Sequence, residues 1–224
     1  RVPGHQLIKI PDNVDYADAA SLPVAYGTAH RMMYTRGQLT SDDKVLILGA
    51  SGGVGTGALI LAKITGAEVV ACGSSQAKLD ALKGMGADHV IDYTQTDFVK
   101  EVWKLYEKPH RRNGNGGVDV VVNFTGGDTW VKSMKCLRRN GRLLTCGATA
   151  GYDPTTDLRY VWSFELDIRG SNSWEPEDLV SLLDLIESGA LKVPIYKFYP
   201  LIETHEALRV IEDREVIGKV IVEP

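Results

Sequence analysis

A glycine-rich turn suited to holding phosphate follows the apolar segment Val45–Leu48. Its fixed positions read Ala50-x-Gly52-x-x-Gly55, with Ala50 in place of the first glycine of the G-x-G-x-x-G pattern. Gly52 leaves the backbone open to close approach by a phosphate, and Gly55 lets the next helix pack tightly on the strand. The N-terminus of that helix favours an anion. Because the turn lies between a strand and a helix, it predicts binding of a dinucleotide through its pyrophosphate.

The end of the second strand indicates which dinucleotide is bound. An NAD site normally carries Asp or Glu there, about 20 residues after the glycines, to bond the ribose hydroxyls. This chain has no acid from Val69 to Leu79. Gly73 leaves room for a 2′-phosphate, and suitable hydroxyl groups and a positive charge come from Ser74, Ser75 and Lys78. Ser74 or Ser75 could instead cap the following helix, and such a cap is compatible with phosphate binding. The segment therefore predicts NADP(H).

The elements around this turn alternate between apolar strands and helices, the pattern of a parallel sheet covered on both faces. The predicted strands are Val45–Leu48, Val69–Cys72, His89–Ile91, Val118–Asn123, Arg142–Cys146 and Asp167–Gly170. The predicted helices are Val54–Thr65, Ala77–Gly84, Phe98–Tyr106 and Thr129–Leu137. This order predicts the α/β fold class, with a doubly wound six-stranded parallel (Rossmann) sheet.

The flanks have a different pattern and predict parts of a second domain. Residues 1–22 hold an extended piece, Gln6–Ile10, and the start of a helix rich in small residues. Residues 173–224 hold predicted helices at Glu177–Ser188 and Glu203–Asp213, and predicted strands at Ile195–Pro200 and Lys219–Val222. The predicted dinucleotide-binding domain is therefore 23–172, with a remnant of another domain before it and a returning segment after it.

The composition is that of an ordinary globular protein, and it disfavours several classes of function. The formal net charge of −4 disfavours nucleic-acid binding. Scattered histidines and three cysteines without CxxC spacing predict no metal site and a reducing compartment, the cytoplasm. The uncharged stretch Val45–Ala62 contains a glycine cluster, so it predicts a strand, a turn and a helix rather than a membrane span. The polar, basic loop Lys108–Gly117 is interpreted as a solvated connection, because no motif there supports an anion or partner site.

Further motifs occur from about Leu7 to the C-terminus. They are Ala19–Ala29, Gly49–Gly55, Gly86–Tyr93, Gly117–Val122, Gly141–Gly147, Ile168–Ser171 and Gly218–Ile221. Together they resemble the medium-chain dehydrogenase/reductase superfamily, in its quinone-oxidoreductase-like or zinc-type alcohol-dehydrogenase-like branch. The resemblance implies that the two flanks belong to a GroES-like catalytic domain, most of which lies outside this sequence.

The resemblance also implies a map of the cofactor site. Against the pyrophosphate it places Ser51, Gly52, Gly53 and Val54. At the 2′-phosphate it places Ser74, Lys78 and Tyr93, beside Gly73 and Ser75. Phe124 and Thr125 are expected beside the adenosine ribose, and the nicotinamide is expected along Thr28, Cys146, Gly147, Ser171 and Asn172. Core packing is the open alternative for Phe124 and Cys146. No catalytic residue is assigned.

The activity implied by the resemblance is that of an NADPH-dependent quinone or enone reductase, which transfers hydride to a small electron-poor substrate. Two alternatives stay open: a fragment of a zinc-dependent alcohol dehydrogenase, and an inactive NADP-binding module. Members of the superfamily commonly pair through the last strand of the sheet, here residues 165–171. Leu166 and Ile168 alternate with charged residues in this segment, so we expect a homodimer through that edge.

Overall fold

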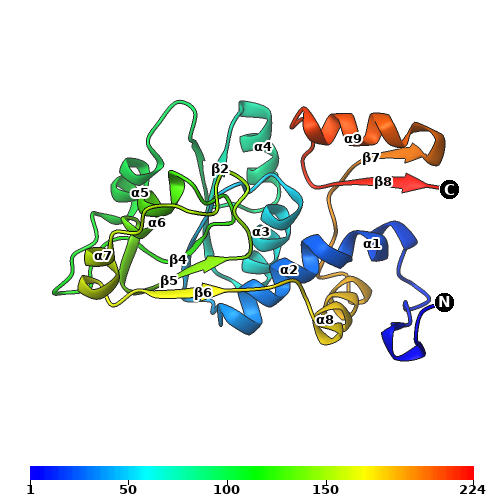
Figure 1. The fold of residues 1–224 in the computed structure, drawn as a ribbon, viewed down its shortest axis with the longest axis horizontal. Helices are drawn as coiled ribbons and strands as arrows, with labels where there is room; N and C mark the ends of the chain where they lie inside the picture. The colour runs from blue at the N-terminus through cyan, green and yellow to red at the C-terminus, as the bar shows by residue number, and fades with distance from the viewer.

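The computed structural model describes Arg1–Pro224, apart from the side chain of His5. Its centre is a six-stranded parallel sheet in the order β3-β2-β1-β4-β5-β6 (Figure 1). The strands are β1 Lys44–Ile47, β2 Glu68–Gly73, β3 His89–Asp92, β4 Val118–Val122, β5 Leu137–Thr145 and β6 Asp167–Gly170. The strand order reverses between β1 and β4, where the carboxyl ends of the strands leave a crevice for a dinucleotide. The predicted fold class is confirmed.

Helices cover both faces of this sheet. On one face pack α2 Gly27–His30, α3 Gly53–Thr65, α4 Gln76–Gly84 and α8 Pro176–Glu187. On the other face pack α5 Phe98–Tyr106, α6 Thr129–Met134 and α7 Leu158–Ser163. Along β1, Val45 and Ile47 belong to the first core, whereas Leu46 and the following Leu48 belong to the second. Continuous apolar strands of this kind are typical of sheets buried on both sides.

A broken helix precedes the sheet. It consists of α1 Tyr16–Ser21 and α2, with wider helical turns at Leu22–Tyr26 and Arg31–Arg36. Val24 interrupts it with φ 65° and ψ −70°, a strained conformation for a β-branched residue. After the break Ala25 turns inward and packs against the start of α3, while Val24 remains exposed.

The C-terminal residues form a second, two-stranded parallel sheet, β7 Ile195–Pro200 and β8 Lys219–Glu223, on which α9 Thr204–Glu212 packs. Figure 1 shows this C-terminal unit beside α1 and α3, at the opposite end of the molecule from α7. The N–H of Gly218 donates to the carbonyl oxygen of Ser51 in the glycine turn, at 3.1 Å. This hydrogen bond fixes the start of β8 next to the predicted phosphate site.

One boundary between a helix and a strand was predicted wrongly. The helix expected at Thr129–Leu137 ends at Met134, and the strand expected to begin at Arg142 begins at Leu137. The physical reason is strand pairing, since Leu137 lies in parallel register with Val118 and therefore cannot continue the helix.

The remaining predicted elements differ by at most one residue at either end, except at the N-terminus and before β6. The piece expected to be extended, Gln6–Ile10, joins no strand in the described chain, and a single 3₁₀ turn covers Gly4–Gln6. Helix α7 and the broken helix after Ser21 have no counterpart among the predicted elements. No described helix combines the length and the apolar character that crossing a membrane requires.

Candidate cofactor site

The glycine turn has the backbone geometry that a phosphate group needs. Gly49 takes a left-handed φ of 65°, and α3 begins directly after Gly52. The N–H of Ala50 donates to the carbonyl oxygen of Cys72 at 3.3 Å, which fixes the turn to β2. A side chain at Gly55 would overlap the Gly49 carbonyl oxygen, so only glycine lets α3 approach β1 this closely.

The outer side of the turn is open. A Cβ atom on Gly52 would meet only the carbonyl oxygen of Gly49, at 3.6 Å. No side chain caps α3, so the N–H groups of its first turn, at Gly53, Val54 and Gly55, stay available to a ligand. The helix dipole adds to the attraction for an anion. The residues present therefore fit a dinucleotide pyrophosphate.

The C-terminal unit brings a lysine to this turn. Lys219 begins β8, and its Cδ atom lies 3.5 Å from the position that a Cβ on Gly53 would take. Burial lowers the pKa of the Lys219 ammonium group. A phosphate beside it would raise that pKa again, because an opposite charge favours the protonated form. The sequence alone allows Lys219 to be interpreted as a phosphate contact or as a solvated lysine near the C-terminus, and it favours the second interpretation.

Hydroxyl and basic groups gather where β2 ends. Ser75 caps α4, because its Oγ accepts a hydrogen bond from the Lys78 N–H at 3.4 Å. The Lys78 ammonium donates to the carbonyl oxygen of Arg214 at 2.7 Å, and the Tyr93 N–H donates to the carbonyl oxygen of Gly73 at 3.2 Å. Tyr93 and Arg214 line the same cavity of about 340 Å³, so Lys78 reaches the edge of this cavity through Arg214.

The acidic groups near this cavity do not come from β2. Asp92 of β3 lies in register with Gly73, but its carboxylate accepts hydrogen bonds from Thr94 and lines a different cavity. Asp97 and Asp128 also line this cavity, and they lie at the N-termini of α5 and α6. The end of β2 therefore presents the half-buried Ser74 and its basic neighbours without a carboxylate.

A buried asparagine shapes the loop that follows β4. Asn123 is fully buried, and its Oδ1 accepts hydrogen bonds from the N–H groups of Thr125 and Gly126, both at 2.9 Å. Its amide nitrogen donates to the hydroxyl oxygens of Thr129 at 3.0 Å and Ser133 at 2.9 Å. These bonds set the direction of the loop that carries the predicted adenosine contacts, of which Thr125 lines the 340 Å³ cavity. Asn123 is a positioning residue that the sequence pattern did not reveal.

The loop also carries Phe124, whose ring sits against the glycine turn. A Cβ on Gly49 would lie 3.1 Å from Phe124 Cε2. Phe124 is half-buried and packs against the core that includes α3. Core packing, the alternative to a cofactor contact, therefore accounts for part of its side chain.

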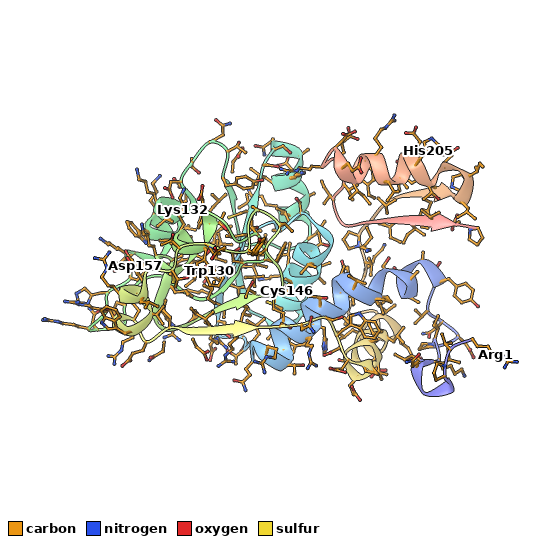
Figure 2. The ribbon with its side chains drawn as sticks, in the orientation of Figure 1. Arg1, Trp130, Lys132, Cys146, Asp157 and His205 are labelled. Atoms are coloured by element: carbon orange, nitrogen blue, oxygen red, sulfur yellow. The ribbon has the colours of Figure 1, made fainter. Side chains whose placement is uncertain are left out.

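Four of the five predicted nicotinamide residues directly follow β5 or β6, and the fifth, Thr28, does not. Cys146 is half-buried near the centre of the molecule (Figure 2), and burial raises the pKa of its thiol to about 11. It therefore stays a neutral thiol at neutral pH. An added Cβ on Gly147 would have only ordinary contacts with Phe124, at 3.7 Å or more, so the backbone there is open. Thr28 is buried in α2, and Asn172 is exposed after β6.

Ser171 carries a buried hydroxyl group that could bind a ligand. Its N–H donates to the Thr145 carbonyl oxygen at 2.8 Å, which continues the pairing of β6 with β5. Its Oγ is buried and has no hydrogen-bond partner among the described residues. A buried hydroxyl without a partner is costly, and a polar ligand group would satisfy it. This orphaned atom fits a polar group such as the carboxamide of a nicotinamide.

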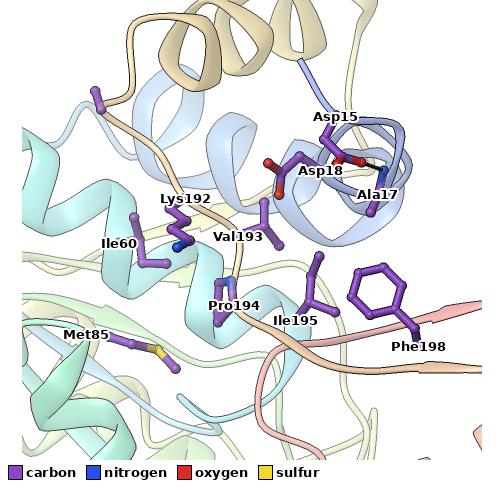
Figure 3. Close-up of a pocket in the computed structure, with 11 residues that line it drawn as sticks. Asp15, Ala17, Asp18, Ile60, Met85, Lys192, Val193, Pro194, Ile195 and Phe198 are labelled. Atoms are coloured by element: carbon purple, nitrogen blue, oxygen red, sulfur yellow. Dashed lines mark hydrogen bonds between the residues drawn. The ribbon is translucent and has the colours of Figure 1, made fainter. Parts of the chain in front are cut away.

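Another cavity lies away from this site. It has a volume of about 700 Å³ between α1, α3 and the segment that leads into β7. Figure 3 shows Asp15 and Asp18 on its α1 side and Ile60 and Met85 on its other side. None of the predicted cofactor residues lines it.

The described residues also include no group of three or more His, Cys, Asp or Glu side chains placed to share a metal ion. The prediction that the chain holds no metal stays a prediction.

The strand order, the glycine turn and the open helix N-terminus together define a nicotinamide-dinucleotide-binding domain. Residues 53–188 match the family model described as zinc-binding dehydrogenase. The chain belongs to this family, within the medium-chain dehydrogenase/reductase superfamily.

Its relatives include reductases and alcohol dehydrogenases. Crotonyl-CoA reductase of Streptomyces avermitilis is 30% identical over 218 residues, which are 92% of this chain and 49% of that protein. The 2-octenoyl-CoA carboxylase reductase CinF, in complex with NADP and 2-octenoyl-CoA, superposes with a TM-score of 0.87 at 34% identity. This match covers 99% of this chain and 52% of CinF. An NAD-dependent alcohol dehydrogenase superposes with a TM-score of 0.87 at 33% identity, over 100% of this chain and 63% of that one.

The chain thus spans about half the length of crotonyl-CoA reductase. It spans 10% of the phthioceranic/hydroxyphthioceranic acid synthase of Mycobacterium tuberculosis, to which it is 30% identical over 222 residues.

Proposed function

We propose that this chain is the NADPH-binding part of a reductase that acts on an electron-poor C=C bond or a quinone. The observation that carries the cofactor assignment is the end of β2, where no carboxylate stands and Lys78, Tyr93 and Arg214 converge. A 2′-phosphate at this place would find cationic and hydroxyl donors. The ribose hydroxyls of NAD would lack their usual carboxylate partner.

The likeness to crotonyl-CoA reductase and to CinF supports an α,β-unsaturated carbonyl compound as the substrate class. Bound NADPH supplies the hydride. The protein residues bind and orient the cofactor: the first turn of α3 and Lys219 at the pyrophosphate, and Ser171 Oγ at the carboxamide. Positioning of this kind is the main contribution of a protein to hydride transfer.

The neutral Cys146 thiol is not a general base at neutral pH, because its pKa is raised to about 11. The proton that completes the reduction comes from solvent or from a hydroxyl group. We place the rest of the substrate pocket in the GroES-like domain to which 1–22 and 173–224 would belong. We also propose, from its three free cysteines, that the protein works in a reducing compartment, the cytoplasm.

The cofactor assignment is tested by titrating the chain with NADPH and with NADH and following the nicotinamide fluorescence. We expect NADPH to bind more tightly. Lys78→Ala and Arg214→Ala should each weaken NADPH binding about tenfold, because a charge-assisted hydrogen bond contributes about 1.5–3 kcal/mol and this site is partly solvated. Neither substitution should change NADH binding. Lys83→Ala, at the other end of α4, is the matched control and should leave both affinities unchanged.

Equal affinity for both cofactors would refute the NADP assignment and leave the dinucleotide fold intact. The activity is tested separately, by oxidation of NADPH in the presence of crotonyl-CoA, an enone or a quinone. Tight binding without turnover by the complete protein would favour the alternative of an NADP-binding module.

A further inference from the structure

A second candidate binding groove lies between the end of α5, the loop 107–117 and α7. It is a groove of about 180 Å³, and its lining includes Trp103, Tyr160 and Phe164. The rings of Tyr160 and Phe164 are stacked, with centroids 5.8 Å apart and planes inclined by 14°. The indole N–H of Trp103 donates to the carbonyl oxygen of Lys135 at 3.0 Å, which holds this ring in place. The groove therefore has an ordered aromatic floor.

The rim of the groove is basic. Lys108, Arg111, Lys135 and Arg159 line it, and no acidic side chain does so among the described residues. Arg159 pairs with Asp157 at 2.9 Å, whereas the other three form no ion pair in the described chain. The Lys108 ammonium lies 5.0 Å from the centroid of the Trp103 ring, so a cation also covers the aromatic floor. This local excess of positive charge stands out on a chain whose net charge is −4.

The groove is separate from the cofactor site. The loop 107–117 leads into β4, Lys135 precedes β5, and α7 leads into β6. Because all these strands are parallel, the groove lies at their amino ends, whereas the glycine turn lies at the carboxyl ends. In Figure 2, Asp157 at the start of α7 lies on the far side of the molecule from His205 in the C-terminal unit. A ligand in the groove therefore does not touch the bound dinucleotide.

We propose that this groove docks an acidic peptide segment of a partner protein, with one large apolar side chain held on the aromatic floor. Its volume is below the about 300–1,000 Å³ of pockets that enclose small organic ligands, which favours a single side chain as the occupant. Trp, Tyr and Arg are the residue types that dominate binding energy at protein interfaces. The basic rim is complementary to Asp and Glu on either side of the apolar side chain.

The sequence pattern indicated that the basic loop is a solvated connection. In the proposal, this loop forms a binding groove together with residues that are distant in the sequence. Lys108 and Arg111 belong to that loop, but Lys135 and Arg159 reach the groove from other elements. A long nucleic acid is a poorer occupant, because a chain of net charge −4 would repel the phosphates beyond this small patch.

The probe for the test is a fluorescein-labelled peptide of alternating Asp and Glu with one central Phe, and binding is followed by fluorescence anisotropy. We expect saturable binding that weakens as salt is added. The double charge reversal Lys108→Glu/Arg111→Glu should lower the affinity by about tenfold or more. Lys100→Glu/Lys104→Glu reverses two exposed charges on α5 that do not line the groove, and it should change the affinity by less than about twofold. Thermal unfolding and NADPH titration of each variant check that the fold is intact.

Two further peptides separate the components of the proposal. A peptide with Gly in place of the central Phe should bind about tenfold more weakly, and one with Lys in place of the acids should not bind. Equal binding of the Gly peptide would show attraction by charge alone and overturn the groove as a docking site. Absence of saturable binding below about 1 mM would also overturn it. If the chain self-associates and Lys108→Glu/Arg111→Glu abolishes this, the occupant is a second copy and the peptide proposal is wrong.

Discussion

Replacement of Asn123 by alanine tests whether the loop after β4 is held by one buried side chain. The substitution removes an acceptor shared by the N–H groups of Thr125 and Gly126 and a donor to two hydroxyl groups. A buried donor left without a partner costs about 1–3 kcal/mol. Gly126 is buried and Thr125 is half-buried, so we expect Asn123→Ala to lower the free energy of unfolding by about 3 kcal/mol. This would lower Tm by about 6–12 °C for a domain of this size.

The measurement is chemical denaturation monitored by tryptophan fluorescence, together with NADPH titration of the folded variant. NADPH affinity should fall as well, because Thr125 and the ring of Phe124 lose their fixed position beside the glycine turn. Asn113→Ala is the matched control, since Asn113 lies in an exposed turn and should change stability by less than about 0.5 kcal/mol. A loss of less than about 0.5 kcal/mol in Asn123→Ala would refute the argument that Asn123 organises the loop.

Three other predictions concern a thiol, a carboxylate and the edge of the sheet. Since the pKa of Cys146 is raised to about 11, its alkylation by iodoacetamide, mapped by mass spectrometry, should be slow at neutral pH and accelerate about tenfold per pH unit; a fast rate at pH 7 would contradict this. Burial raises the pKa of Asp178, but hydrogen bonds, that from the Glu175 N–H foremost, outweigh it and leave the pKa lowered. The stabilisation by Asp178 is therefore fully present above the unfolded carboxyl pKa of about 4, and it is lost as the pH falls through the lowered folded pKa. Acid denaturation should show that the free energies of unfolding of the wild type and Asp178→Asn become more similar over that pH range. For the homodimer that we propose through β6, Ile168→Asp should halve the mass measured by sedimentation, whereas Val180→Asp, on exposed α8 surface, should not; a wild-type monomer would rule out this dimer.

The sheet could be predicted from the sequence because its strands are short apolar runs between turn residues. β6 and α5 have the predicted bounds, since each is delimited by a local signal such as the Asp97 cap of α5. β5 was predicted too short because its first residues include Arg138 and Arg139, which do not look like a buried strand. Their polarity is compatible with a strand here because the amino end of β5 reaches the surface.

The broken helix after Ser21 could not be predicted for a different reason. Pro23 and Val24 have backbone angles that end a regular helix, yet the chain continues as a helix after them. Tertiary packing of Tyr26 and Ala29 against α3 compensates for that local cost. A pattern based on local preferences cannot register such compensation.

The candidate site also combines residues in local sequence motifs with residues that are distant in the sequence. The glycine turn and the acid-free end of β2 are local features, so their positions in the sequence already indicate a dinucleotide. Arg214 lies 136 residues after Lys78, and Lys219 follows it in the chain. They reach the site only because the C-terminal unit folds back and Gly218 bonds to the glycine turn. No local spacing connects them with the phosphate loop.

This separation has a consequence for cofactor choice. The Lys78 ammonium is held by the Arg214 carbonyl oxygen, a neutral acceptor, so its positive charge remains available to a 2′-phosphate. A carboxylate in the same place would cancel that charge. The carbonyl is fixed by the loop between α9 and β8, where Arg214 has a left-handed φ of 59°. We therefore propose that the returning C-terminal segment contributes to both parts of the cofactor site, through Lys219 at the pyrophosphate and through Arg214 beside Lys78 at the 2′-phosphate.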